Sequence, residues 1–319
     1  MKSSYDGKCD RPFCCSLQGL AYSCSAMPAL GTDPNDQRWD GPPPGAGYAR
    51  PTNRRGWGSI AIAMQTLNAP WPRTLWIVRH GQSAGNVARD AAEAAGHALI
   101  DVEHRDIDVP LSPLGVDQSR ALGRWFGGLL PAHRPQVVLC SPYVRARDTA
   151  RLVLEEARMR PGVDVRLRVD ERLREKEFGI LDRLTKHGVR QKYPELDEQR
   201  SHVGKFYFRP PGGESWCDVI LRLRSLTEMV TREHGGERVL VVAHQVIVNC
   251  MRYLLENLDE AEILAVDRLG DVPNCSVTSY QLDAAARCLQ LDLVNFVAPL
   301  VQAGAPVTAA KDVPAAPKP

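Results

Sequence analysis

Short hydrophobic runs recur through the middle of the chain, separated by stretches with helical periodicity. The run TLWIVRH at residues 74–80 is continuously apolar until it reaches Arg79, so it predicts a buried strand. Residues 136–141 (QVVLCS) and 238–244 (RVLVVAH) follow the same pattern and predict two more buried strands. Alternation of polar and apolar positions predicts further strands over 163–169, 276–282 and 288–296.

Helical patterns lie between these strands. In residues 112–130 the apolar positions recur at helical spacing, Ser112 is a suitable cap and Pro113 suits the first turn. Strands that alternate with helices predict the α/β class, here a three-layer α/β/α sandwich with a mostly parallel central sheet. Further helices are predicted over about 142–158, 214–233 and 246–256.

The two ends of the chain differ from this pattern. Residues 1–70 contain eight Pro and eight Gly with few periodic apolar positions, which predicts a disordered extension. Met64 lies just before the first strand, and we hypothesise that the functional product begins there. The tail 301–319 is rich in Ala and Pro and is also predicted to be disordered, which leaves 71–300 as the folded domain.

Charge and composition exclude several classes of protein. The formal net charge of +2 over 319 residues gives no global field that favours nucleic acid or an anionic membrane. The longest apolar runs, such as 239–243, are too short to span a bilayer, and the N-terminus does not resemble a secretory signal.

Four of the nine cysteines lie in the first 24 residues, where a metal site is the minor alternative, and the other five show no metal-ligand spacing. We expect a cytoplasmic protein with reduced cysteines in its core.

Three predicted strands lead into side chains that suit a phosphate. The first strand ends at Arg79 and His80, the second leads through Ser141 to Arg145, and the third ends at His244. Because the carboxyl ends of parallel strands meet in one crevice, we expect these side chains to lie close together. Guanidinium groups match phosphate oxygens in bidentate fashion, and helix N-termini add further donors. The group therefore predicts a site for a dianionic phosphoryl group.

Each of these signals is weak alone, because a histidine at a strand end is more often structural. Their order along the chain is specific, and it resembles the histidine phosphatase superfamily, also called phosphoglycerate-mutase-like, over about residues 74–296. The motifs that carry the resemblance are RHGQSAGN (79–86), LSPLG (111–115), SPYVRARDTA (141–150), LREKEFG (173–179), PGGES (211–215), VVAHQ (241–245) and PNCSVT (273–278).

The resemblance implies a role for each matched residue. His80 would become phosphorylated, and Glu175 would be the general acid, with Glu177 as the nearby competitor. Arg145 matches the family's arginine in SPYVRARD, whereas Arg147 is assigned to structure or to the rim of the site. The groups implied to hold the phosphoryl oxygens are Arg79, Asn86, Arg145 and His244. For His244 the mechanism argued from the residues expects a cation that stabilises charge on these oxygens. The remaining substrate-binding residues are predicted to be Ser83, Lys205 and Gln245.

The same residues suggest a mechanism from chemistry alone. Neutral His80 would attack phosphorus in line and form a phosphohistidine, which water then cleaves. Glu175 would protonate the departing alkoxide and later take a proton from the water, so a raised pKa is expected for its carboxyl. The arginines supply positive charge at the phosphoryl oxygens, so we expect neither a metal nor a cofactor.

The substrate is less clearly indicated. The segment 184–216 looks most like the bisphosphatase module that acts on fructose 2,6-bisphosphate, and like its small phosphatase relatives. Lys205 matches a basic residue that grips the second phosphate in that module. The chain departs from the module at Ser201, Trp216 and Lys186, which stand where it has an arginine and two tyrosines.

Residues 87–110 also differ from that module. They would either cover the site or present their many charged side chains to solvent as a solvated face. Glu214 in the GGES turn is interpreted as a helix cap. The remaining histidines are predicted to lie on the surface: His97, His133, His187, His202 and His234.

We therefore expect a metal-independent phosphomonoesterase that acts on a small phosphorylated metabolite, such as a sugar phosphate or bisphosphate. The alternatives are a cofactor-primed phosphoglycerate mutase and a phosphoprotein phosphatase. The mutase is disfavoured because the sequence suggests neither the long active-site insertion nor the ordered tail expected of such enzymes. A non-catalytic phosphate-binding module would be expected to have lost His80, Glu175 or His244, and all three are present. We expect no nucleic acid or membrane partner, and a monomer or homodimer.

Overall fold

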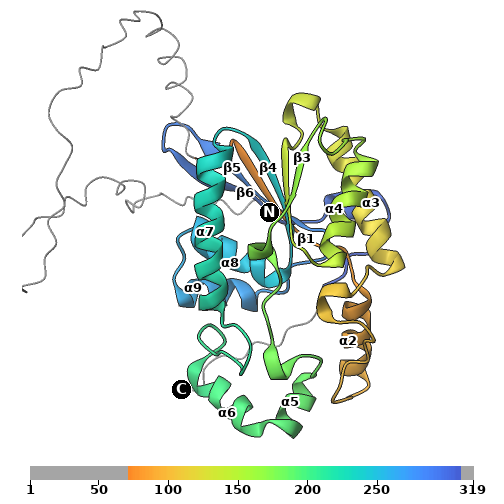
Figure 1. Cartoon of the computed structure of the whole chain (residues 1–319), viewed down its shortest axis with the longest axis vertical. Helices are drawn as coiled ribbons and strands as arrows, with labels where there is room; N and C mark the ends of the chain where they lie inside the picture. The colour runs from red at the N-terminus through yellow and green to blue at the C-terminus, as the bar shows by residue number, and fades with distance from the viewer. Residues whose placement is uncertain (1–70, 310–319) are drawn as a thin grey trace, which may run out of the picture. The chain divides into compact units, whose positions relative to one another are not determined.

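The computed structural model describes residues 71–309 (Figure 1). The predicted disorder of 1–70, the hypothesis about Met64 and the last ten residues of the tail therefore lie outside the described residues. So do the four N-terminal cysteines. Of the other five, Cys140, Cys250 and Cys275 are buried, whereas Cys217 and Cys288 are only partly buried.

The described strands form one six-stranded sheet in the order β3-β2-β4-β1-β5-β6. The four strands from β3 to β1 are parallel, and the pairings of β5 with β1 and with β6 are antiparallel. The expectation of a mostly parallel sheet is confirmed, with the two antiparallel pairings at one edge. The strands are β1 (Thr74–Arg79), β2 (Val137–Cys140), β3 (Arg166–Val169), β4 (Arg238–Ala243), β5 (Val277–Asp283) and β6 (Cys288–Phe296).

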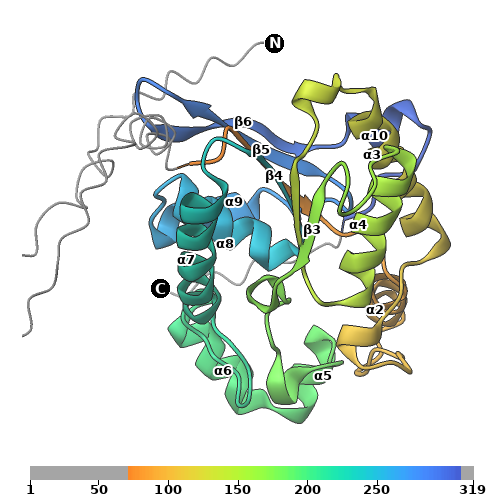
Figure 2. The same ribbon diagram turned by 45° about the horizontal axis from the view of Figure 1, so that its top comes forward.

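Helices cover both faces of this sheet, as Figures 1 and 2 show. Successive residues of a strand point to opposite faces, so Leu75 and Ile77 belong to one core cluster and Trp76 and Val78 to the other. The three-layer α/β/α arrangement is thereby confirmed. The first cluster lies under α7 (Trp216–His234), α8 (Gln245–Leu255) and α9 (Glu260–Arg268), and the second under α3 (Pro113–Gly128), α4 (Val144–Glu156) and α10 (Ala298–Gln302).

Local sequence explains where two of these helices begin. The hydroxyl of Ser112 accepts a hydrogen bond from the Gly115 N–H, and Pro113 occupies the first turn of α3, as predicted. Helix α7 begins one residue after Ser215, whose side chain accepts from the Asp218 N–H in a capping box. These caps place the starts of the helices within two residues of the predicted boundaries.

Five helices and four short 3₁₀ turns among the described residues were not predicted from the sequence. Ala92 is the one buried residue of α2, and α6 buries none, so neither helix packs a broad apolar face against the core. The unpredicted helices are α2 (Ala84–Ala94), α5 (Lys186–Lys192), α6 (Pro194–Val203), α9 and α10, and the 3₁₀ turns are η2 (Asp106–Asp108), η3 (Pro131–His133), η4 (Glu171–Leu173) and η5 (Gly179–Leu181).

The prediction of a disordered tail is wrong for residues 301–309. Buried Gln118 donates hydrogen bonds from Nε2 to Pro306 O at 2.8 Å and to Thr308 Oγ1 at 2.9 Å. The Asn274 N–H donates to Thr308 O at 2.8 Å. The Ala- and Pro-rich composition hid this order because polar groups of distant segments, and not an apolar face, hold the tail. The lack of an ordered tail therefore no longer argues against a mutase.

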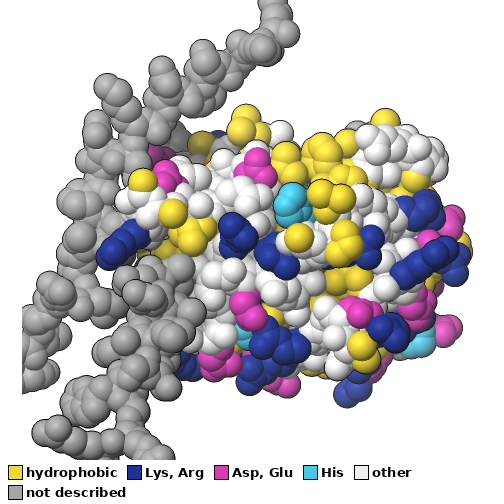
Figure 3. Space-filling view, turned by 90° about the horizontal axis from the view of Figure 1, so that it is seen from above, with side chains coloured by type: hydrophobic (Ala, Val, Ile, Leu, Met, Phe, Trp, Pro, Cys, Tyr) yellow, Lys and Arg dark blue, Asp and Glu magenta, His cyan; other side chains and the backbone are white. Residues whose placement is uncertain are grey.

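The surface of the described domain carries charges of both signs. Basic and acidic side chains lie interspersed on the face shown in Figure 3, in keeping with the small net charge. Between residues 71 and 309, no helix combines the length and apolar character needed to cross a membrane.

Four of the five histidines predicted for the surface are exposed, but His234 is 7% exposed and shares a 3.0 Å hydrogen bond with Glu237. For His234 the prediction is wrong, because it ends α7 against the core.

Candidate active site

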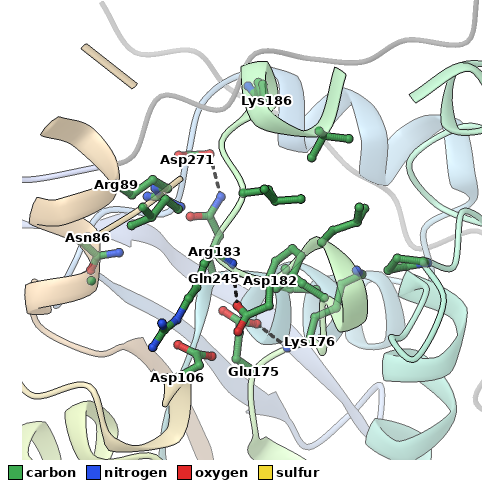
Figure 4. Close-up of a pocket in the computed structure, with 18 of the residues that line it drawn as sticks. Asn86, Arg89, Asp106, Glu175, Lys176, Asp182, Arg183, Lys186, Gln245 and Asp271 are labelled. Atoms are coloured by element: carbon green, nitrogen blue, oxygen red, sulfur yellow. Dashed lines mark hydrogen bonds between the residues drawn. The ribbon is translucent and has the colours of Figure 1, made fainter. Parts of the chain in front are cut away.

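A pocket of about 860 Å³ brings together residues that follow β1, β2 and β4. These strands are neighbours in the parallel part of the sheet, with Arg79 paired to Ala243 and Cys140 to Val242. Their carboxyl ends therefore meet at one edge, as expected for a parallel sheet. Arg79, His80, Ser83, Asn86, Arg145, Glu175, Lys205 and Gln245 all line the pocket, and Figure 4 shows several of its side chains.

The His80 imidazole is held in one tautomer by its two neighbours. Its Nδ1 lies 2.7 Å from the carbonyl oxygen of Gly81, which can only accept, so the proton is assigned to Nδ1. Arg145 Nε donates to His80 Nε2 at 3.3 Å, so Nε2 carries the lone pair. Burial lowers the pKa of His80 well below its ordinary value, and the Arg145 and Arg79 charges lower it further. His80 is therefore neutral at pH 7 and has a nucleophilic nitrogen in the pocket.

The glycine after His80 is required by close packing against α3. A Cβ at Gly81 would lie 2.5 Å from Gly115 O and 2.8 Å from Ser119 Oγ. Its N–H donates to Thr149 Oγ1 at 3.0 Å, which joins the turn to α4. The RHG turn is thus fixed between two helices on one side of the sheet.

Arg79 is the last residue of β1 and is 3% exposed. Its Nη1 donates to Val272 O, whereas its Nε has no hydrogen-bond partner among residues 71–309. Burial is the main cause that lowers the pKa of Arg79 to about 10, and the Arg89 charge adds to it. The guanidinium still carries its charge at pH 7, and an anion in the pocket would stabilise it.

Arg145 lies in the first turn of α4 and contacts a residue that the sequence did not single out. Its Nη1 lies 3.0 Å from Asp106 Oδ1 and donates to Asp106 O, and its Nη2 donates to Asp106 Oδ2 at 3.2 Å. Asp106 belongs to the 3₁₀ turn η2 within the 87–110 segment. That segment contains many carboxylates, and nothing in their spacing identifies the one that reaches the pocket.

His244 is fully buried against His80, and their ring centroids are 5.1 Å apart. Its Nε2 shares a 2.8 Å hydrogen bond with Ser141 Oγ, and its Nδ1 has no partner in the described part of the chain. Burial lowers the pKa of His244 well below its ordinary value, and Arg145 adds to this effect. The expectation of a cationic His244 is therefore wrong for the protein groups alone, although a dianion beside it would oppose this shift.

The structure separates the two glutamates that the sequence left in competition. Glu175 lines the pocket, and burial raises its pKa, against the opposing hydrogen bond of 2.8 Å from the Lys176 N–H. The Glu177 side chain is 49% exposed and accepts a hydrogen bond from the Tyr143 hydroxyl at 3.2 Å. A raised pKa and a place in the pocket suit Glu175 for proton transfer.

Glu214 supports the segment that carries Glu175 and does not cap α7. Its carboxylate accepts hydrogen bonds from Arg174 Nη2 at 2.7 Å and from Arg222 Nε at 3.0 Å. Arg222 also donates from Nη2 to the backbone oxygen of Glu175 at 3.2 Å. The interpretation of Glu214 as a cap is wrong because Ser215, one residue later, takes that place.

The other predicted substrate-binding residues already have protein partners. Lys205 Nζ donates to Asp267 Oδ2 at 2.8 Å, and Gln245 Nε2 donates to Asp271 Oδ1 at 2.6 Å (Figure 4). Ser83 and Asn86 form the capping box at the start of α2. Each of these four residues therefore lines the pocket and also makes a hydrogen bond within the protein.

Comparison with known proteins identifies the family to which the chain belongs. The sequence model of the Histidine phosphatase superfamily (branch 1) matches residues 75–295, more than two thirds of the chain. The chain belongs to the histidine phosphatase superfamily. The resemblance in the motifs is thus confirmed, and the matched range contains every residue discussed above as part of the site.

Relatives of this member of the superfamily include both mutases and phosphatases. A 2,3-bisphosphoglycerate-dependent phosphoglycerate mutase 2 from Gloeobacter violaceus is 33% identical over 212 residues, which cover 66% of this chain and 86% of the mutase. A 6-phosphofructo-2-kinase/fructose-2,6-bisphosphatase from Caenorhabditis elegans is 28% identical over 223 residues, which cover 69% of this chain and 42% of that protein. A solved structure of mycobacterial glucosyl-3-phosphoglycerate phosphatase with VO3 is 27% identical with a TM-score of 0.52, and covers 70% of this chain and 99% of its own.

Arg89 is a second residue of the pocket that the sequence analysis did not identify. It belongs to the 87–110 segment, which was expected either to cover the site or to present its charged side chains to solvent. Arg89 lines the pocket, and its Nη2 is buried without a partner among residues 71–309. Its charge lowers the pKa of both Arg79 and His80. Once α2 is recognised as a helix, the three-residue spacing from Asn86 places Arg89 on the same face.

The rest of the lining combines cations with apolar side chains. Lys176 is 8% exposed, and burial lowers its pKa to about 8. Its ammonium lies 4.6 Å from the centre of the Phe178 ring. Other cations of the lining are Arg183, Lys186, Arg190, Arg200 and Lys205, and its apolar residues include Ile100, Val102, Leu181, Leu184, Val189 and Phe208. Such a lining suits an anionic organic molecule that is much larger than phosphate.

Proposed function

We propose that this chain is a phosphomonoesterase that forms a phosphohistidine at His80 and acts on a small phosphorylated metabolite. The observation that carries the proposal is the state of His80: a neutral imidazole whose Nε2 lone pair faces the Arg145 guanidinium. Lone pair and cation are what an in-line attack on a phosphoryl group requires, because one supplies electrons and the other stabilises the equatorial oxygens.

Unused polar atoms support the binding of an anion beside His80. Arg79 Nε, Arg89 Nη2 and His244 Nδ1 are buried and have no partner within residues 71–309. Buried polar atoms normally have hydrogen-bond partners, so a cluster of such atoms favours a ligand that supplies acceptors. A phosphoryl group has the charge and the oxygens to serve all of them.

The proposed reaction proceeds in two steps. His80 Nε2 forms a bond to phosphorus as the bond to the leaving oxygen breaks, and Glu175 gives its proton to that oxygen. The oxygen of a water molecule then forms a bond to phosphorus as the bond between phosphorus and His80 Nε2 breaks, the water gives a proton to Glu175, and inorganic phosphate leaves. The guanidinium groups of Arg79 and Arg145 hold the transferring oxygens throughout, and the hydrogen bond from His80 Nδ1 to Gly81 O keeps the ring oriented.

A sugar phosphate or bisphosphate remains the proposed substrate class. The pocket volume of about 860 Å³ and its outer cations support an organic body with a further polar or anionic group. The name of the mycobacterial relative, glucosyl-3-phosphoglycerate phosphatase, supports the same class. Lys205 is proposed to contact that body, with Asp267 holding its ammonium in place.

A primed phosphoglycerate mutase is the second candidate. It is favoured by the mutase from Gloeobacter violaceus, the relative that is 33% identical, and by the order of residues 301–309. Conversion of 3-phosphoglycerate to 2-phosphoglycerate that depends on a bisphosphoglycerate primer, at a rate above that of phosphate release, would support this candidate over the phosphatase.

The test of the proposed function is hydrolysis of an aryl phosphate in the presence of EDTA by the wild type and His80→Ala. We expect the variant to lose at least about 10³-fold in kcat and to form no acid-labile phosphoprotein. Exposed His133 offers a matched control, and His133→Ala should keep its activity within twofold. Unchanged hydrolysis by His80→Ala would reject the nucleophile.

A further inference from the structure

The guanidinium of Arg145 is occupied on all three nitrogens by protein groups. Nε donates to His80, whereas both terminal nitrogens contact Asp106. The Arg145 side chain is 6% exposed, and the Asp106 carboxylate, 41% exposed, covers it from the solvent side. A phosphoryl group could contact the terminal nitrogens only where the carboxylate now lies.

We propose that Asp106 is a latch on the phosphate site: its carboxylate occupies Arg145 in the unliganded protein and must leave before a phosphoryl group can bind there. This inference rests on the proposed function in one respect, that Arg145 is a phosphoryl-binding residue. The latch selects against ligands that offer only a phosphate, because such a ligand must replace two charge-assisted contacts and brings no others.

The backbone that carries the latch is anchored to the opposite rim of the pocket. His104 O accepts from Arg183 Nη2 at 2.7 Å, and the Ile100 N–H donates to Arg183 O at 2.8 Å. Thr185 Oγ1 donates to His97 O at 2.6 Å. These three contacts hold the segment on the N-terminal side of η2, and the Ala84 N–H, which donates to Pro110 O at 2.9 Å, holds it on the other side. Rotation of the Asp106 side chain would therefore free its carboxylate from Arg145 without opening the loop, while Asp106 O keeps its contact with Arg145 Nη1.

Neighbouring carboxyls favour the latched position. The Asp106 charge raises the pKa of both Asp182 and Glu175, so its carboxylate is close enough to act on them. A carboxylate released from Arg145 would keep these acidic neighbours and lose its cation. A substrate with an organic body gains contacts from the outer pocket that offset this loss, whereas inorganic phosphate, the product, gains none. The latch therefore weakens product inhibition.

Equilibrium binding of inorganic phosphate at pH 7.5, followed by titration calorimetry, tests the latch without relying on turnover. Asp106→Asn keeps the shape but removes the charge, and Asp106→Ala removes both. We expect each variant to bind phosphate about five- to tenfold more tightly than the wild type. Asp108 lies two residues away with an exposed 2.6 Å contact to Arg105, so Asp108→Asn is the matched control and should bind as the wild type does.

An unchanged or weaker affinity in both Asp106 variants would overturn the latch, and so would a failure of both to bind phosphate. Weaker binding would mean that Asp106 merely positions Arg145. The outcome is separate from the test of His80, since tighter phosphate binding by Asp106→Asn would support the latch even if His80→Ala still hydrolysed an aryl phosphate. If the Asp106 variants reject the latch while His80→Ala is inactive, the proposed function remains supported.

Discussion

Arg145 donates a hydrogen bond from Nε to Nε2 of His80 over 3.3 Å, so the cation and the lone pair of the site are already in contact. This contact aligns the guanidinium beside the nitrogen that would attack phosphorus. It also lowers the pKa of His80, because the Arg145 charge disfavours a second proton on the ring.

Replacing this guanidinium is expected to reduce activity strongly. Arg145→Lys keeps the charge but loses the planar fork and the donor to His80 Nε2, so kcat/KM for an aryl phosphate should fall by about 10²-fold. Arg147 lies on the same helix but is exposed, and Arg147→Lys should stay within twofold of the wild type. Equal losses in the two variants would contradict the assignment of Arg145 to the site.

The role of Glu175 predicts a dependence on the leaving group. Glu175→Gln cannot donate the proton that an alkoxide needs, so kcat on an alkyl phosphate should fall by about 10²–10⁴-fold. An aryl phosphate has a better leaving group and should lose much less. Glu177→Gln, whose side chain lies outside the pocket lining, is the control and should lose little on either substrate. The measurement is the steady-state kcat of each variant on the alkyl and the aryl phosphate. Equal losses of kcat for Glu175→Gln on both esters would argue against Glu175 as the general acid.

Two buried neutral histidines predict a pH dependence of stability. The pKa values of His80 and His244 lie well below the ordinary value of 6.5 in the folded protein, mainly through burial. Below about pH 6.5 the unfolded chain therefore binds protons that the folded chain does not, and the free energy of unfolding falls as the pH decreases. Each histidine contributes a slope of up to about 1.4 kcal/mol per pH unit.

The measurement is urea unfolding between pH 5 and 7.5. His80→Gln should show a shallower loss of stability below pH 6.5 than the wild type, because one of the two groups is gone. His133→Gln removes an exposed histidine and should leave the slope unchanged. A slope in His80→Gln equal to that of the wild type would mean that His80 is not held neutral by the fold.

The ordered residues 301–309 predict a stabilising role for Thr308. Its hydroxyl accepts from buried Gln118 Nε2 at 2.9 Å and donates to Asn274 Oδ1 at 3.0 Å. Thr308→Val keeps the shape and removes both hydrogen bonds, so the free energy of unfolding should fall by about 1–2 kcal/mol. Thr231→Val on the surface of α7 should cost less than about 0.5 kcal/mol. If urea unfolding finds both variants equally stable, the tail contacts do not contribute.

The tail also reaches the site through Asn274. Asn274 Nδ2 donates to His80 O at 2.9 Å, and its N–H donates to Thr308 O. Hydrogen bonds through Asn274 therefore connect the backbone of His80 to a segment more than 220 residues away in the sequence. No local pattern in 301–309 predicts this, because the partners are brought together by the sheet and α3.

Periodicity was sufficient to predict the elements that build the sheet. Buried runs and alternating segments located all six strands, and Ser112 with Pro113 located the start of α3. These patterns are local, because the burial of a strand or of one helix face determines which neighbouring positions are hydrophobic. Helices α2 and α6 were missed because their burial is slight.

The sequence by itself determined which residues stand where the parallel strands end: Arg79 and His80 after β1, Arg145 after β2 and His244 after β4. A parallel sheet brings these ends to one edge, so order along the chain was enough to predict their meeting. Only the tertiary structure decided that the Asp106 carboxylate contacts Arg145, that Glu175 and not Glu177 lines the pocket, and that burial lowers the pKa of His244. These features depend on which distant groups share a desolvated space, and that depends on the path of the whole chain.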